Sequence, residues 1–117
     1  MAVTWDEVVA FCLTLPEVTY GTSWNHPSLK AGKKLLTNLH EPGGMTIKLG
    51  SVDEQDHMVE LDPNLYYIND HFKGWPGCLM RLDQADMDVV RGHVLRVYYQ
   101  IATKRAIKAY EAGNAGT

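Results

Sequence analysis

The chain lacks the features that would place it in a membrane or in a disulfide-rich secreted class. It has no apolar run near the ~20 residues that a membrane-spanning helix needs. Its acidic N-terminus does not have the basic start of a signal peptide. Only two cysteines occur, Cys12 and Cys78, and they lie far apart, which favours a reducing compartment. We therefore expect a cytoplasmic protein that does not associate with membranes.

Motifs for catalysis, metals and cofactors are also missing. None of the five histidines shares the i,i+4 or His-x-His spacing typical of a metal site. Gly43-Gly44 fits a hairpin turn rather than a phosphate-binding loop, and no serine lies in a nucleophile elbow. Neither cysteine has the basic neighbours that mark a nucleophile. We expect no catalytic residues, no metal site and no cofactor, and hence a protein that is not an enzyme.

Positive charge is scarce overall and unevenly distributed. The net charge is −3, which argues against strong electrostatic binding to nucleic acid. Residues 1–70 contain four Lys or Arg and ten Asp or Glu, whereas residues 71–110 contain seven and three. The asymmetry is compatible with a positive face on an acidic molecule, and equally with helices that carry solvated basic side chains.

The length and composition suit one folded domain. The chain has 117 residues, of which 45% are hydrophobic and 21% charged, the usual mixture for a globular protein. We expect a single domain over residues 1–113, followed by a short C-terminal tail, residues 114–117.

Capping signals and apolar periodicity predict four helices. The expected N-terminal caps are Thr4 with Glu7, Ser51 with Glu54, Asp86, and Thr103. The residues expected to end the first and last helices are Pro16 and Gly113. Apolar residues recur at helical spacing from Met87 to Ile101, so one stripe of this helix is expected to face the core.

Short β-prone segments separated by glycine and proline turns predict strands, whereas residues 17–28 have no clear period. The expected strands are residues 28–30, 34–39, 45–49, 65–68 and 78–82. Short turns predict antiparallel pairing. The resulting fold is α+β, with a five-stranded antiparallel sheet, helices on one face and the order α-β-β-β-α-β-β-α-α. Alternation in two strands puts Lys48 and Arg81 on the helix-free face, within reach of each other or of a common acid.

The segment from His71 to Gly77 is predicted to be a tight turn between two strands. Its glycines and Pro76 suit a turn. A turn does not need Phe72, Lys73 and Trp75, so we expect these side chains to be exposed and to form a contact surface.

An ordered set of motifs runs from Thr4 to Tyr110. It comprises Leu15-Pro16-Glu17, Gly21-Thr22-Ser23-Trp24, Pro27, Lys30-Ala31-Gly32-Lys33, Lys48, His71-Phe72-Lys73-Gly74-Trp75-Pro76, Arg81-Leu82-Asp83, Tyr98, Lys104 and Tyr110. This set resembles the MmcQ/YjbR-like family. The resemblance implies a small α+β fold similar to secretion-chaperone folds, and DNA binding through two wing-like hairpins. Trp75 departs from the family pattern, which often has a smaller or different residue there.

The resulting hypothesis is weak, salt-sensitive DNA binding, in which cations bind phosphates and an aromatic ring stacks on a base. The candidate residues are Lys30, Lys33, Lys48, Lys73, Trp75 and Arg81. The alternative to a binding role is that the lysines only keep the edge strands and turns soluble.

Two rival functions remain open at this stage. One is a protein- or peptide-binding module that uses the open sheet face with Tyr66, Tyr67 and Trp75. The other is an enzyme or small-ligand binder with a pocket near Trp24, His26 and His71.

Overall fold

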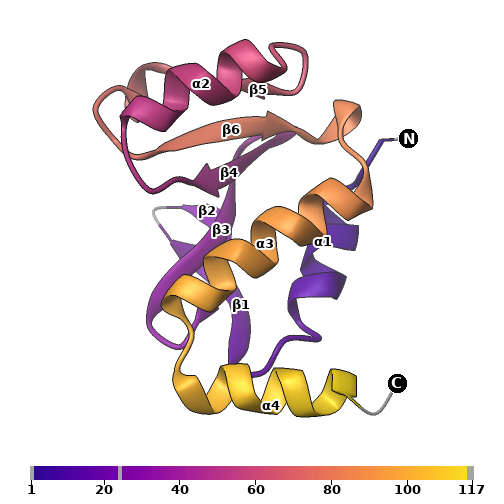
Figure 1. Cartoon of the computed structure of the whole chain (residues 1–117). Coiled ribbons are helices and arrows are strands. Elements are labelled where there is room, and N and C mark those ends of the chain that lie inside the picture. The colour runs from indigo at the N-terminus through magenta and orange to yellow at the C-terminus, as the bar shows by residue number, and fades with distance from the viewer. Residues whose placement is uncertain (1, 24, 116–117) are drawn as a thin grey trace.

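The computed structural model describes residues 2–23 and 25–115. Within these ranges the chain forms four α-helices around one six-stranded sheet (Figure 1). The helices are α1 Trp5–Cys12, α2 Asp53–Leu61, α3 Met87–Ile101 and α4 Lys104–Ala115. The strands are β1 Val18–Ser23, β2 His26–Ala31, β3 Lys34–Glu41, β4 Gly44–Lys48, β5 Tyr66–Tyr67 and β6 Gly77–Arg81. Two short 3-10 helices are η1 Asp70–Phe72 and η2 Leu82–Gln84.

The sheet is antiparallel throughout, with the strand order β1-β2-β3-β4-β6-β5. The predicted α+β class and antiparallel pairing are confirmed, but the prediction of five strands is wrong. The missed strand is β1, which lies at one edge of the sheet. Four consecutive residues of β1, Thr19 to Thr22, are exposed, so this strand has no apolar alternation for a sequence pattern to detect.

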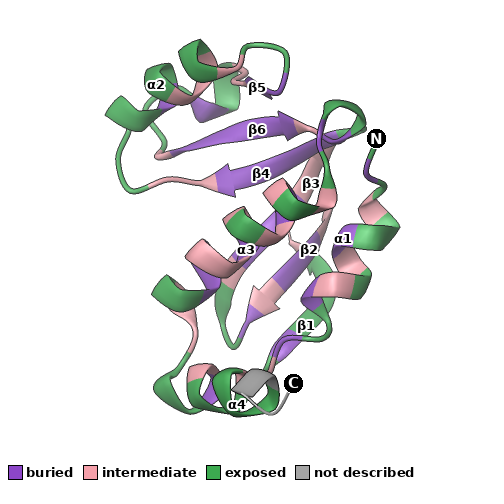
Figure 2. Ribbon diagram, turned by 45° about the vertical axis from the view of Figure 1, so that its right-hand side comes forward, coloured by how far each residue is buried: buried purple, intermediate pink, exposed green. Residues whose placement is uncertain are grey.

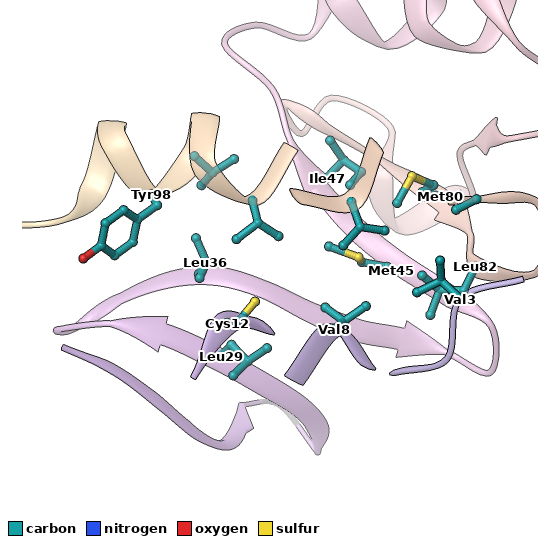
Figure 3. Close-up of a cluster of buried hydrophobic side chains, with 14 of the residues drawn as sticks. Val3, Val8, Cys12, Leu29, Leu36, Met45, Ile47, Met80, Leu82 and Tyr98 are labelled. Carbon is teal, nitrogen blue, oxygen red and sulfur yellow. The ribbon is translucent and has the colours of Figure 1, made fainter. Parts of the chain in front are cut away.

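The main core lies between the sheet and the helices α1 and α3 (Figures 2 and 3). In Figure 3, Leu36, Met45 and Ile47 from the strands fill the space beneath α3, and Val8 and Cys12 enter the same core from α1. The predicted stripe of α3 is confirmed, because its buried residues recur at helical spacing. They are Val90, Val94, Val97 and Tyr98.

Three of the four predicted helix caps are confirmed. Thr4 and Glu7 form a reciprocal capping box, with the Thr4 N–H donating to Glu7 Oε1 at 3.0 Å and the Glu7 N–H donating to Thr4 Oγ1 at 3.2 Å. Asp86 accepts from the Val89 N–H at 3.0 Å. Thr103 accepts from the Ala106 N–H, also at 3.0 Å. A side-chain cap costs about 0.5–2 kcal/mol when it is removed, so these local signals set where three helices begin.

The remaining boundary predictions need correction. The Ser51–Glu54 box does not form, because the Glu54 carboxylate accepts from the Gly50 N–H at 3.0 Å and α2 begins only at Asp53. Helix α1 ends at Cys12, before Pro16, where the Thr14 hydroxyl donates to the Phe11 carbonyl at 2.6 Å. Helix α4 continues past Gly113 to Ala115.

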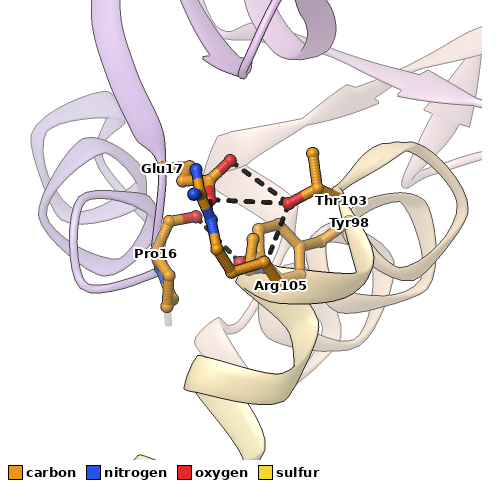
Figure 4. Close-up of polar contacts among 6 residues, drawn as sticks. Pro16, Glu17, Tyr98, Thr103 and Arg105 are labelled. Carbon is orange, nitrogen blue, oxygen red and sulfur yellow. Dashed lines mark hydrogen bonds and ion pairs between the residues drawn. The ribbon is translucent and has the colours of Figure 1, made fainter.

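The junction between α3 and α4 is joined to the start of β1 by side-chain hydrogen bonds (Figure 4). The Tyr98 hydroxyl donates to the Pro16 carbonyl at 2.8 Å. Glu17, which has a left-handed φ of 66°, accepts from the Thr103 hydroxyl at 3.3 Å and from Arg105 Nε at 3.3 Å. These contacts join residues more than 80 positions apart, so the C-terminal helices are fixed to the first edge of the sheet.

Both cysteines are free thiols in the interior. Cys12 packs in the core as predicted, and burial raises its pKa to about 12. Burial also raises the pKa of Cys78 to about 12, although the nearby Arg96 opposes the change. A thiol of this kind is almost entirely protonated at neutral pH and is a poor nucleophile.

No helix within the described residues combines the length and the apolar character needed to cross a lipid bilayer.

Candidate functional site

The face of the sheet opposite α1 and α3 carries a second, separate set of side chains. Along β4 and β6, Lys48 pairs opposite Gly77 and Gly44 opposite Arg81, while the alternate pair Met45 and Met80 points into the main core. The register therefore places Lys48 and Arg81 on the open face, as the alternation predicted.

The segment between β5 and β6 lies across part of this open face. We call residues 69–77 the wall segment. Its 3-10 helix η1 places Phe72 only 4% exposed, with its ring edge-on to His40 at a centroid separation of 5.1 Å. Trp75 is 37% exposed and packs edge-on against Phe72 at 5.3 Å. The prediction that Phe72 is exposed is wrong, because the segment folds back onto the sheet instead of projecting as a tight turn.

Helix α2 holds the wall segment in place through one buried side chain. Gln55 Nε2 donates to the carbonyl of Gly77 at 2.8 Å and to the carbonyls of Phe72 and Trp75. Gly77 is required for the fit as well, because a Cβ at this position would overlap the Trp75 ring. The aromatic side chains of the segment are thus preorganised by contacts beneath them.

Two adjoining hollows lie between the wall segment and the sheet, with volumes of about 340 and 600 Å³. Together we call them the open-face groove. The first hollow is lined by Leu35, Asn38, His40, Thr46, His71, Phe72 and Trp75. The second is lined by His26, Asn38, His40, Glu41, Asn69 and His71. Three residues line both hollows, so the groove runs from an apolar end near Trp75 to a polar end near Glu41.

Three histidines meet in the polar half of the groove. The His26 and His40 rings stack with centroids 4.9 Å apart, and the His71 ring lies edge-on to His40 at 5.4 Å. Burial lowers the pKa of His40, and the neighbouring His26 and His71 lower it further, while Glu41 opposes the change. Over the described parts of the chain, no three or more His, Cys, Asp or Glu side chains are arranged to hold a metal ion.

Sequence reasoning placed His26 and His71 in one pocket but missed His40. The three histidines come from β2, β3 and the wall segment, so no local spacing connects them. Trp24, proposed for the same pocket, lies outside the described residues.

Glu41 organises the polar end of the groove. Its carboxylate accepts from the Tyr67 hydroxyl at 3.0 Å and from Asn69 Nδ2 at 3.0 Å. Burial, together with this bond to Glu41, raises the pKa of Tyr67 to about 12, so its hydroxyl remains a donor at neutral pH. The Arg81 guanidinium covers the Tyr67 ring at 4.2 Å and donates to the Pro63 carbonyl at 3.2 Å.

The floor of the groove carries a hydrogen-bond donor at Asn38. This residue is 8% exposed, and its Oδ1 accepts from the Thr46 hydroxyl. Asn38 Nδ2 has no hydrogen-bond partner among the described residues. Within the same residues, the only side-chain N or O atom that is both fully enclosed and without a partner is Trp5 Nε1. Asn38 Nδ2 is therefore not fully enclosed, and it reaches the groove surface with its hydrogens available.

Lysines gather at the apolar end, around Leu35. Lys48 Nζ donates to the Leu35 carbonyl at 3.1 Å, and Lys30 lies opposite Leu35 in the β2–β3 register. Burial lowers the pKa of Lys48, and Lys34 is close enough to lower it further. Lys34 was not among the predicted nucleic-acid-binding residues, although it follows Lys33 directly and is the first residue of β3.

The other predicted basic residues are dispersed. Lys33 is exposed in the β2–β3 turn, and Lys73 forms an exposed ion pair with Asp70 at 3.3 Å. Arg81 lies at the opposite end of the β4–β6 pair from Lys48, and each side chain binds a different backbone carbonyl. The prediction that Lys48 and Arg81 reach each other or share an acid is therefore wrong.

Comparison with known proteins gives full-length similarity to proteins of uncharacterised function. No protein-family model matches the chain, and no solved structure matches it. Three similar proteins, one from Mycobacterium bovis and two from strains of Mycobacterium tuberculosis, are each named as uncharacterised. Each is 22% identical over 126 aligned positions, which cover 95% of this chain and 98% of the relative. The resemblance to the MmcQ/YjbR-like family stays a prediction.

Proposed function

We propose that the chain is a nucleic-acid-binding module that takes a single strand along the open face of its sheet. The observation that carries this proposal is the combination of a partly exposed Trp75 ring with lysines at the same end of the groove. Aromatic platforms beside cationic side chains are the usual means of binding single strands without strict sequence preference.

The negative net charge is opposed by lysines only at one end of the groove. Asp6 and Glu7 lie in α1, on the opposite side of the sheet, but Asp53, Glu54 and Asp56 are in the first turn of α2 beside the wall segment, and Glu41 lines the polar end. The lysines around Leu35 are therefore expected to attract phosphate at the apolar end alone. Weak affinity that falls readily with salt is the expected result.

The geometry changes the wing hypothesis in one respect. The β2–β3 hairpin carries Lys30 and Lys33 as a wing would, whereas the second proposed wing is the wall of the groove. Lys73 on this wall is bound only by an exposed ion pair, and such pairs contribute about 0–1 kcal/mol, so a phosphate can replace Asp70 as its partner.

A salt titration of binding to single-stranded and duplex oligonucleotides tests the proposal. Replacing Lys30, Lys33 and Lys73 together by Ala is expected to weaken binding to every sequence alike. It should also flatten the salt dependence by roughly 2 in log–log slope, because each single-strand phosphate contact contributes about 0.7.

A double variant, Lys104→Ala with Lys108→Ala, serves as the control, because it removes positive charge from α4 and leaves the groove unchanged. Absence of binding by the native chain at low salt contradicts the proposal, and so does an equal loss in the control.

The main alternative is a protein- or peptide-binding module on the same face. The apolar end formed by Leu35, Phe72 and Trp75 favours it. Its predicted use of Tyr66 is wrong, however, because Tyr66 is 5% exposed and its hydroxyl lies 2.6 Å from His93 Nε2 inside the core. A partner that is released by Trp75→Ala and is insensitive to salt would support this alternative.

A further inference from the structure

We infer that the open-face groove holds one unstacked nucleobase with its face against Trp75 and an acceptor atom of its edge against Asn38. This inference rests on the proposed function and specifies the contact that makes the protein select single strands.

The apolar hollow has the size and the lining of a small-molecule site. Its volume of about 340 Å³ lies at the lower end of the roughly 300–1,000 Å³ typical of ligand pockets. Such pockets have mostly apolar walls and few polar groups. Here Leu35, Phe72 and Trp75 form the apolar walls, Asn38 and Thr46 lie on the floor, and His40 and His71 supply the other polar groups.

The rings of the wall are fixed before a ligand arrives. Phe72 is perpendicular both to His40 and to Trp75, with interplanar angles of 87°, so each ring limits rotation of the next. Gln55 donates to the backbone carbonyls of both Phe72 and Trp75. A planar base can therefore stack on the exposed part of Trp75 without reordering the segment.

Asn38 supplies a hydrogen-bond donor at the floor. The Thr46 hydroxyl donates to Asn38 Oδ1, and Thr46 in turn is fixed through its own carbonyl, which accepts from the Thr37 hydroxyl at 2.7 Å. This chain of bonds directs the Asn38 amide hydrogens into the groove. Every base offers them an acceptor on its edge, a carbonyl oxygen in thymine and a ring nitrogen in adenine.

The lysines at the Leu35 end can donate hydrogen bonds to the phosphate next to the bound base. Lys48 uses one of its three N–H donors on the Leu35 carbonyl, which leaves two available. A paired base in a duplex cannot insert its face and edge in this way. The geometry therefore favours a single strand over a duplex beyond what charge alone provides.

Equilibrium binding to four probes tests the inference. The probes are a 15-nucleotide oligothymidylate, the matching oligodeoxyadenylate, a strand of 15 abasic sugar phosphates, and thymidine 5′-monophosphate. We expect the thymidine and adenine strands each to bind about tenfold more tightly than the abasic strand, because one good base contact is worth ~1–3 kcal/mol.

Two substitutions separate stacking from edge recognition. Trp75→Ala should lower thymidine-strand affinity about tenfold or more, and Trp75→Phe should restore part of it. Asn38→Asp keeps the acceptor for Thr46 but removes the amide donors. Its added charge weakens binding to all strands alike, so the readout is the ratio of thymidine-strand to abasic-strand affinity, which should fall towards the value left by Trp75 stacking alone.

Equal affinity for thymidine, adenine and abasic strands overturns the inference and leaves phosphate-driven binding intact. Thymidine monophosphate that shifts the NMR signals of the Trp75 indole and the Asn38 amide, without binding of any strand, supports the base site and overturns the proposed function. No response to any probe at low salt overturns both.

Discussion

Gly77 is the residue at which one added methyl group would displace the wall of the groove. A Cβ here overlaps the Trp75 ring and lies 3.1 Å from the Ile47 carbonyl oxygen. Gly77→Ala should therefore displace Trp75 and lower the free energy of unfolding by about 1–3 kcal/mol, the usual cost of overpacking. Urea denaturation measures the stability, and near-ultraviolet circular dichroism reports the Trp75 environment.

Gly92→Ala is the matched control for this prediction. Gly92 lies in α3, and an added Cβ meets nothing within 4 Å, so the change should stabilise the helix by about 0.5–1 kcal/mol. A Gly77→Ala protein with native stability and an unchanged near-ultraviolet spectrum would show that the wall is not held by this contact.

His93 makes the stability depend on pH. Burial and the nearby Arg96 lower its pKa to about 4, whereas an unfolded imidazole titrates near 6.5. Between these values the unfolded state binds more protons, so the stabilisation is present above pH 6.5 and is lost as the pH falls towards 4. Because His93 is partly exposed, we expect its contribution to the free energy of unfolding to be roughly 2 kcal/mol.

Urea unfolding of the native chain and of His93→Gln at several pH values between 4 and 7.5 tests this effect. The difference in free energy of unfolding between the two proteins should shrink as the pH falls, because glutamine does not titrate. A constant difference across this range would contradict the assignment.

At the scale of elements, α2 acts as the support of the wall segment. Gln55→Met retains the length of the side chain but leaves the carbonyls of Phe72, Trp75 and Gly77 without their donor. We expect a loss of about 1–3 kcal/mol in stability and faster amide hydrogen exchange in residues 70–77. The control is Gln100→Met on the exposed face of α3, which should change neither quantity. Unaltered exchange in the Gln55 variant would mean that the segment is held from elsewhere.

A comparison of helix starts with strand β1 shows which features are determined by residues close together in the sequence. Thr4, Asp86 and Thr103 begin their helices as predicted, since a cap needs only a side chain three residues from a free N–H. The edge strand β1 was missed because its outward residues carry no apolar pattern.

The groove was partly foreseeable. Alternation placed Lys48 on the open face, and Trp75 marked the wall segment, but the fold of that segment onto His40 depends on contacts between distant residues. Asn38, a polar residue in the leucine-rich strand segment 35–39, was the sequence signal for the floor.

At the scale of the whole molecule, one continuous core joins both ends of the chain. Val3 belongs to this core, and its N–H donates to the Leu82 carbonyl at 2.8 Å. We expect unfolding in urea to be a single transition, with coincident curves from far-ultraviolet circular dichroism and tryptophan fluorescence. Loss of the fluorescence signal at lower urea than the helical signal would show that the wall segment opens separately.

The two buried thiols allow the rate at which the folded protein opens to be measured by chemical labelling. Because Cys12 and Cys78 are enclosed and protonated in the native state, an alkylating reagent can modify them only in molecules that have opened. At high reagent concentration the labelling rate equals the opening rate, and Cys12 reports on α1 while Cys78 reports on β6. A cysteine introduced on the surface could carry a fluorophore while both native thiols stay in place.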